Sequence, residues 1–247
     1  MIIMLLRSNK AFNMQTLNAV RDYFETYQDD IVWKTKEDGF VRTELPITLL
    51  QLDETLEHFN QIAPFARLRA NFWYPFENAT IRKAQELNTP HTHRAPFASW
   101  VENGGYHHEL FEEMPGYNCS EEEQYLKEKA DIREVKVGTV GSVCLKKTRS
   151  DRVMPDDFVY YYPSAIHQLI KSEPQALSLN AVGQAVRTEI DTYTRETQED
   201  QFEADVTLSR EQNKEVTKTA LKLFDRAPRW HEHEIEREGK SIVYGQP

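Results

Sequence analysis

The stretch ARLRANFWY, from Ala66 to Tyr74, alternates two kinds of side chain along its length. One set is Leu68, Ala70, Phe72 and Tyr74, and the other is Arg67, Arg69, Asn71 and Trp73. Successive side chains of a β-strand point to opposite faces, so this period of two predicts a strand with one apolar and one largely polar face. The polar face would turn either toward the interior of a barrel or toward bulk solvent.

Further short strand candidates follow this stretch, each bounded by turn residues. They are NATIRKAQEL, FASWVEN, YHHELFEE, EVKVGTVGSVCLKK, DFVYYYP, AIHQLI and QALSLNAVG. The pair Gly104-Gly105 separates FASWVEN from YHHELFEE and predicts a turn between them. Many short strands at close spacing are typical of a sandwich or barrel, so residues 65–187 are predicted to form an all-β domain.

Two extensions are expected to flank this domain, an N-terminal one over 1–64 and a C-terminal one over 188–247. The apolar start MIIMLL predicts a packed terminal strand or arm. Apolar residues at helical spacing predict helices in TLNAVRDYFETY (16–27) and LQLDETLEHFNQIAPF (50–65). A third helix is predicted in SREQNKEVTKTALKLF (209–224), with Ser209 as its N-cap. The second His-x-His, in WHEHE (230–234), is expected to be an exposed terminal segment.

The chain has 247 residues, of which 39% are hydrophobic, and its formal net charge is -10. This composition predicts a soluble, acidic protein. That charge argues against nucleic acid or an anionic membrane surface as a partner. No apolar run approaches the roughly 20 residues of a membrane helix. The only cysteines, Cys119 and Cys144, are too few for a disulfide framework and are expected to be structural thiols, which makes a cytoplasmic location the default.

Histidines in two distant strand-like stretches are the candidate metal ligands. His91 and His93 are separated by one residue, so on an extended strand their side chains project from the same face. His167, in AIHQLI, is the best candidate for a third ligand. Three neutral imidazoles leave coordination positions open and suit Fe(II), Ni(II), Cu(II) or Zn(II). The alternative is an ordinary polar strand face.

The order of these features resembles the two halves of a cupin double-stranded β-helix. The first half is TPHTHRAPFASWVENGGYHHELFEE and the second is DDFVYYYPSAIHQLIKSEPQALSLNAVG. The likeness is to the cysteine dioxygenase-like branch, whose iron is held by three histidines without a carboxylate. The glutamate that cupins usually carry after the second histidine is replaced here by Phe97 or Ala98. The resemblance therefore implies a mainly β cupin jelly-roll barrel with helical extensions, and Fe(II) on His91, His93 and His167.

The same resemblance suggests residues for the substrate. Arg69 or Arg67 corresponds to the family's arginine that grips a substrate carboxylate with two parallel hydrogen bonds. The family's Ser-Leu-His-x-Tyr run appears as SLNAV, so Ser178 remains but Asn180 replaces the histidine. Asparagine can donate a hydrogen bond but cannot transfer a proton near neutral pH.

Other aromatic and basic residues are candidates to replace the phenol and imidazole that this run lacks. Among the tyrosines preceding His167, Tyr162 is assigned to substrate binding. His107 and His108 point to opposite faces of their strand, so at most one of them can share the face of His91 and His93. That one would act as an acid or base, or both would lie at the surface. A cysteine that crosslinks to tyrosine in the family falls near Ala98, so no such crosslink forms here.

These expectations combine into a mononuclear non-haem iron oxygenase that acts with dioxygen on a small carboxylate-bearing substrate, a thiol or an amino acid. One alternative is a non-redox cupin, an isomerase, lyase or hydrolase that uses Zn(II), Ni(II) or Mn(II) as a Lewis acid. Another is a non-catalytic cupin-like binding protein. Cupins often dimerise, so a homodimer is the expectation for the assembly.

Overall fold

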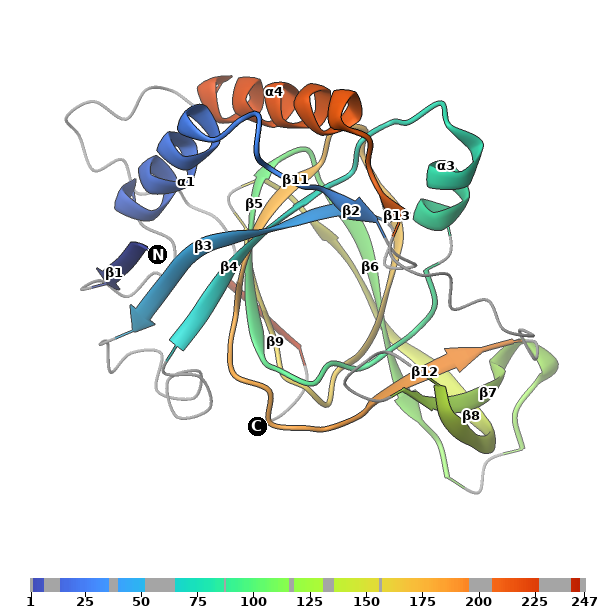
Figure 1. The fold of residues 1–247 in the computed structure, drawn as a ribbon. Helices are drawn as coiled ribbons and strands as arrows, with labels where there is room; N and C mark the ends of the chain where they lie inside the picture. Colours follow the sequence, from blue (N-terminus) through green and yellow to red (C-terminus); the bar gives the residue numbers. More distant parts are fainter. Residues whose placement is uncertain are drawn as a thin grey trace.

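The computed structural model describes residues 2–6, 14–35, 40–51, 65–86, 88–115, 118–130, 136–155, 157–195, 206–226 and 241–244. Within these ranges the protein is mainly β, with two sheets that curl around a shared interior (Figure 1). The helix predicted over 50–65 lies mostly outside the described residues, and its two described ends belong to strands. The WHEHE segment also lies outside them.

The larger sheet brings together strands from both ends and the middle of the chain. In pairing order they are β13 (Val206–Thr207), β2 (Lys34–Thr35), β3 (Val41–Gln51), β4 (Phe65–Phe72), β11 (Leu177–Val182), β5 (Phe97–Asn103), β9 (Phe158–Tyr161) and β14 (Ser241–Tyr244), with β1 (Ile2–Leu6) beside β3. Neighbours are antiparallel except for the pairs β1–β3 and β9–β14. The terminal strand predicted from MIIMLL is thus confirmed as β1.

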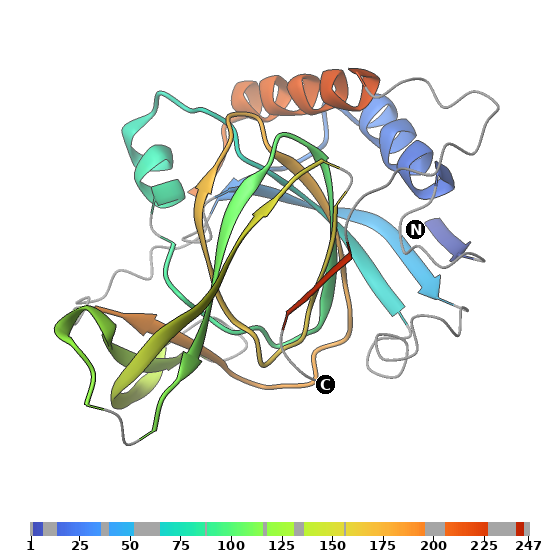
Figure 2. The ribbon, with the colours of Figure 1, turned by 180° about the vertical axis from the view of Figure 1, so that it is seen from behind.

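The smaller sheet is antiparallel throughout. Its order is β10 (Ile166–Ser172), β6 (Tyr106–Glu113), β8 (Lys136–Val153), β7 (Gln124–Ala130) and β12 (Ile190–Thr194), with a short 3-10 turn, η2 (Glu121–Glu123), before β7. The strands at the two ends of this order, β10 and β12, both form an isolated bridge to His91. The far part of β7, β8 and β12 extends away from the rest of the molecule (Figure 2).

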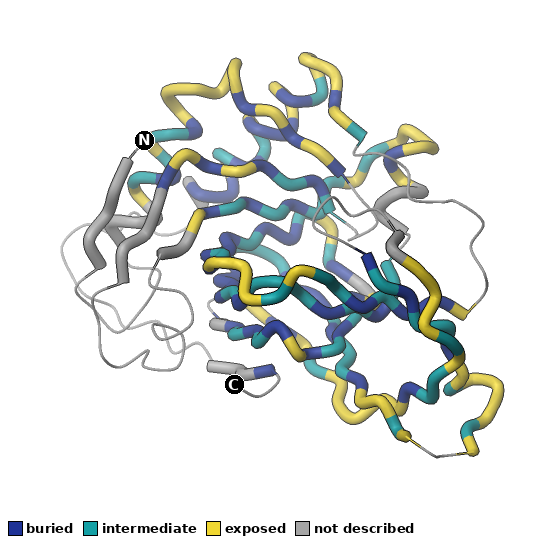
Figure 3. The backbone as a smooth tube through the Cα atoms, turned by 60° about the horizontal axis from the view of Figure 1, so that its bottom comes forward, coloured by how far each residue is buried: buried dark blue, intermediate teal, exposed yellow. Residues whose placement is uncertain are grey.

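The two faces of β4 have the two environments that its alternation predicts. Leu68, Ala70 and Phe72 are fully buried in a core that also holds residues of α1 (Met14–Thr26) and α4 (Arg210–Arg226). Both helices lie over this outer face of the larger sheet (Figure 1), and buried and exposed positions alternate along the strands (Figure 3). Arg69 lies on the opposite face of β4, and its charge contributes to lowering the pKa of His93.

A second core fills the space between the sheets. It joins residues of the larger sheet, such as Val159 and Tyr161, to residues of the smaller one, such as Val153 and Leu169. The predicted Gly104-Gly105 turn is the corner at which the chain leaves β5 of the larger sheet and enters β6 of the smaller one. Gly104 has a positive φ of 69° there, a conformation that glycine adopts most readily.

The predicted strand NATIRKAQEL is wrong, because this segment forms helix α3 (Ala79–Glu86). The Oδ1 of Asn78 accepts hydrogen bonds from the backbone N–H groups of Thr80 and Ile81, at 3.0 and 3.2 Å. An asparagine that caps the first turn in this way starts a helix. The predicted helices at 16–27 and 209–224 are confirmed as α1 and α4.

The predicted cap of α4 is also present. The Ser209 hydroxyl accepts a hydrogen bond from the Gln212 N–H at 3.2 Å, and the Gln212 side chain accepts one from the Ser209 N–H at 2.9 Å. This reciprocal arrangement is a capping box.

The N-terminal segment is more than the predicted helical extension, since it adds β1, β2 and β3 to the larger sheet. The domain boundaries at 64 and 187 stay predictions.

The two cysteines form a disulfide, so the prediction of structural thiols is wrong. Cys119 and Cys144 are joined with their Cα atoms 5.7 Å apart. The antiparallel pairing of β7 with β8 places Gln124 opposite Cys144, and this brings Cys119 within reach. Disulfides are typical of oxidising environments. The cytoplasmic location was predicted from two unpaired cysteines, so that support is gone and the location stays a prediction. None of the described helices is long and apolar enough to cross a membrane.

Candidate metal centre

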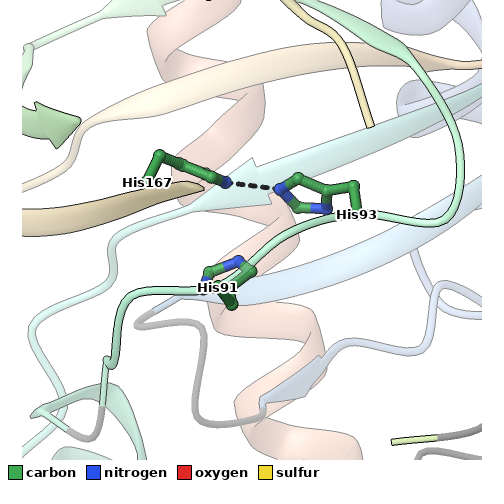
Figure 4. Close-up of side chains that lie close together, drawn as sticks. All are labelled: His91, His93 and His167. Carbon is green, nitrogen blue, oxygen red and sulfur yellow. Dashed lines mark hydrogen bonds between the residues drawn. The ribbon is translucent and has the colours of Figure 1, made fainter. Parts of the chain in front are cut away.

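The three predicted ligands meet through the backbone pairing of their segments. His91 and His167 lie opposite each other and exchange both N–H to C=O hydrogen bonds, each 3.0 Å long. The backbone N–H of His93 donates to the Pro163 carbonyl at 3.2 Å, which holds its segment close to the start of β10. Residues more than 70 positions apart are thus brought side by side by the fold (Figure 4).

The imidazole rings converge on one point (Figure 4). One ring nitrogen from each of His91, His93 and His167 lies within 4.8 Å of the other two. The ring centroids are 4.7 to 5.0 Å apart, and the Nε2 atoms of His93 and His167 contact each other. His91 and His93 are half-buried, whereas His167 is 7% exposed. His91 and His93 are therefore the two members of the cluster that remain partly accessible to solvent.

The outward nitrogens of two rings have partners that fix their direction. The Nδ1–H of His91 donates to the Thr89 carbonyl at 2.8 Å, and this leaves the lone pair on Nε2. The Nδ1 of His167 lies 2.6 Å from the Nε2 of His108, a residue of β6 that is 2% exposed. Ligating histidines usually have such a partner on the nitrogen that faces away from the ion.

Burial favours the neutral form of the His93 and His167 rings. It is the main cause that lowers the pKa of both His93 and His167 well below the ordinary value of 6.5, and neighbouring histidines lower both further. The guanidinium groups of Arg69 and Arg42 add to the effect on His93. Neutral imidazoles carry the lone pair that a metal needs, so the donor set fits a divalent transition-metal ion with open coordination positions.

Phe97, one of the two residues predicted to stand in the place of a cupin glutamate, lies beside the histidines. Its ring lies edge-on to His93 at 4.7 Å and stacks on Tyr161 at 4.1 Å. Ala98, the other candidate, is fully buried in the core on the opposite face of β5. An aromatic side chain therefore lies beside the histidines, and the cluster found among the described residues consists of histidines alone.

Of the two candidate arginines, Arg69 is the one whose charge reaches the histidines. It is half-buried, and its Nε and Nη2 atoms lie 2.7 and 2.6 Å from one Glu44 oxygen, while Arg67 is exposed. Arg42, on the neighbouring strand β3, also acts on His93 and was not anticipated. The alternation in VRTELPI, in which Arg42 and Glu44 fall on one face, was the signal for it.

Asn180 and Ser178 lie on the inward face of β11. Asn180 is paired in register with Arg69 on one side and Ser99 on the other, and Ser178 is paired with Asn71. The side-chain Oδ1 atoms of Asn71 and Asn180 are buried without a hydrogen-bond partner among the described residues. These acceptors, together with Arg69, form a polar strip on the same inward face as Phe97.

The tyrosine whose ring contacts the histidines is Tyr161, in place of the predicted Tyr162. The centroid of Tyr161 lies 4.9 Å from that of His167, and burial raises its pKa well above 10. Tyr160 packs against the core beside the helices, and Tyr162 follows the last residue of β9, where its N–H donates to the Tyr244 carbonyl. Which of the three tyrosines faces the histidines depends on the pairing of β9 with β5, which sets Tyr161 opposite Phe97.

Comparison with known proteins gives little beyond this geometry. No family model matches the chain, and no curated protein does. A solved structure, "X-Ray structure of E. coli ycfD", aligns over 90% of this chain with 11% identity and a TM-score of 0.37. This chain covers 63% of that protein, which is less than two thirds of its length.

Proposed function

We propose that this chain is a cupin-type metal-dependent oxygenase in which His91, His93 and His167 hold Fe(II). The observation that carries the proposal is the convergence of three imidazoles, whose ring nitrogens lie within 4.8 Å of one another, with the His167 ring buried. An iron ion bound there would supply the redox chemistry, with dioxygen and a small substrate as its reactants. The protein residues orient that substrate and exclude water.

The surroundings favour an anionic substrate. The charges of Arg69 and Arg42 act on the site, and a guanidinium can grip a carboxylate with two parallel hydrogen bonds. Arg69 is bound to the exposed carboxylate of Glu44, so an incoming carboxylate would compete with that ion pair. Asn180 would accept a hydrogen bond from the substrate, and Phe97 and Tyr161 would shield it from solvent. A thiol or amino acid bearing a carboxylate fits these surroundings.

Elemental analysis tests the metal site directly. Protein is purified anaerobically without an affinity tag, as wild type, His91→Ala and His167→Ala, with His107→Ala as the matched control. His107 precedes His108 on β6 and points to the opposite face. We expect about one iron per wild-type chain, retained in the control and lost in both ligand variants. Absence of metal, or metal that survives both changes, would refute the proposal.

The identity of the metal separates the oxygenase from its main alternative. Oxygen uptake is measured for iron-loaded protein with panels of carboxylate-bearing thiols and amino acids. Uptake that depends on His91 supports the oxygenase. Stoichiometric zinc or manganese, with no oxygen uptake by iron-reconstituted protein, would favour a non-redox isomerase, lyase or hydrolase.

A further inference from the structure

A fourth histidine, His108, stands directly behind a proposed ligand. Its Nε2 lies 2.6 Å from the Nδ1 of His167 and 3.4 Å from the hydroxyl of Tyr161. The residue is 2% exposed, and its own Nδ1 has no hydrogen-bond partner among the described residues. His108 cannot bind the same ion through Nε2, because His167 lies between them.

Proton positions in this pair follow from the bond between the two rings. If His167 gives the lone pair of Nε2 to an ion, its Nδ1 must carry the proton. The short contact then requires the Nε2 of His108 to be the acceptor, with the His108 proton on Nδ1. In the opposite arrangement His108 donates, and the His167 proton moves to Nε2, where it blocks coordination.

The ring of His108 is held in place by aromatic side chains. Tyr106, Tyr161 and Tyr244 surround it, with ring centroids at 5.8, 5.3 and 5.1 Å. Tyr244 comes from the last described strand, and its hydroxyl donates to Asp151 at 2.9 Å. This cage, defined by the three tyrosines, packs around the imidazole and favours the ring direction that faces His167.

We propose that His108 is a positioning residue: its Nε2 accepts the Nδ1 proton of His167, which fixes the tautomer and ring direction in which His167 binds metal. The inference rests on the proposed metal site and adds to it the residue that prepares one ligand. Partners of this kind typically change metal affinity 10- to 100-fold when they are removed.

The test measures Co(II) binding to chelator-stripped protein by visible absorption and by competition with a chelating dye. The variants are His108→Phe, which keeps a ring but cannot accept, and His108→Gln, whose amide oxygen can accept. We expect a roughly 10- to 100-fold loss of affinity and an altered cobalt spectrum for His108→Phe. His108→Gln should recover most of both properties, and the control His107→Ala should match the wild type.

A second measurement does not depend on whether a variant folds. Nitrogen-15 NMR of histidine-labelled, Zn(II)-loaded wild type should place the His108 proton on Nδ1. A proton on Nε2, or wild-type cobalt affinity in His108→Phe, would overturn the inference while leaving the metal site intact. Failure of the wild type itself to bind Co(II) would instead refute the proposed function, and the inference with it.

Discussion

The buried histidines make the molecule sensitive to acid at the level of single residues. Burial is the main cause that lowers the pKa of His93, His108 and His167, and for His108 it lowers the pKa to about 3. In the unfolded chain each of these side chains returns to a pKa near 6.5. Below that pH the unfolded state therefore binds protons that the folded state refuses.

The free energy of unfolding of the metal-free protein should fall as the pH drops below about 6.5. For each of these histidines the free energy of unfolding falls by up to about 1.4 kcal/mol for each pH unit below 6.5. The contribution is fully present above the unfolded-state pKa. Urea unfolding in chelator at several values between pH 5 and 7.5 measures this slope. His108→Phe should make the slope shallower by about one proton, and equal slopes would contradict the assignment.

At the scale of elements, local signals predicted most of the pieces. The alternation of apolar and polar residues predicted β4, and apolar residues at helical spacing predicted α1 and α4. Ser209 was correctly predicted as the N-cap of α4. The failure at α3 has a local cause, because Asn78 supplies the cap that turns a short mixed segment into a helix. The alternation around Arg42 gives its strand face, but only the pairing of β3 with β4, which sets Arg42 opposite Asn71, shows that this face is the one that carries Arg69.

The corner between β5 and β6 gives an element-scale prediction. A Cβ added at Gly104 would lie 2.9 Å from the Ala176 Cα, in a backbone conformation that other residues rarely adopt. We expect Gly104→Ala to lower the free energy of unfolding by about 1 to 3 kcal/mol. Gly138→Ala, on β8 with nothing within 4 Å of the new atom, is the control and should change it by less than about 0.5 kcal/mol. Equal effects would contradict the steric argument.

At the scale of the whole molecule, the spacing of His91 and His93 and the strand-like context of His167 indicated which histidines could bind metal, but not which residues lie behind them. His91, His93 and His167 could be grouped from sequence. The choice between His107 and His108, or between Tyr161 and Tyr162, depends on which strand face turns inward, and that is decided by pairing across two sheets. The disulfide was missed for the same reason, because it depends on the pairing of β7 with β8.

The disulfide provides a prediction for overall stability. Closing a loop between residues 25 apart restricts the unfolded chain and is worth about 3 kcal/mol. A protein of this size should then lose about 6 to 12 °C in Tm when the bond is removed. Scanning calorimetry of wild type with and without reductant, beside Cys119→Ser, measures it. Reductant should lower the Tm of the wild type to that of the variant, and no shift in the wild type would contradict the prediction.

The bond between Cys119 and Cys144 also makes part of the chain a covalent ring. A protease that cuts once inside this ring leaves two fragments that migrate as one species on a gel. Addition of a reducing agent would release them, with one fragment ending and the other beginning within residues 120–143. A nicked preparation would therefore pass as intact on a denaturing gel run without reductant.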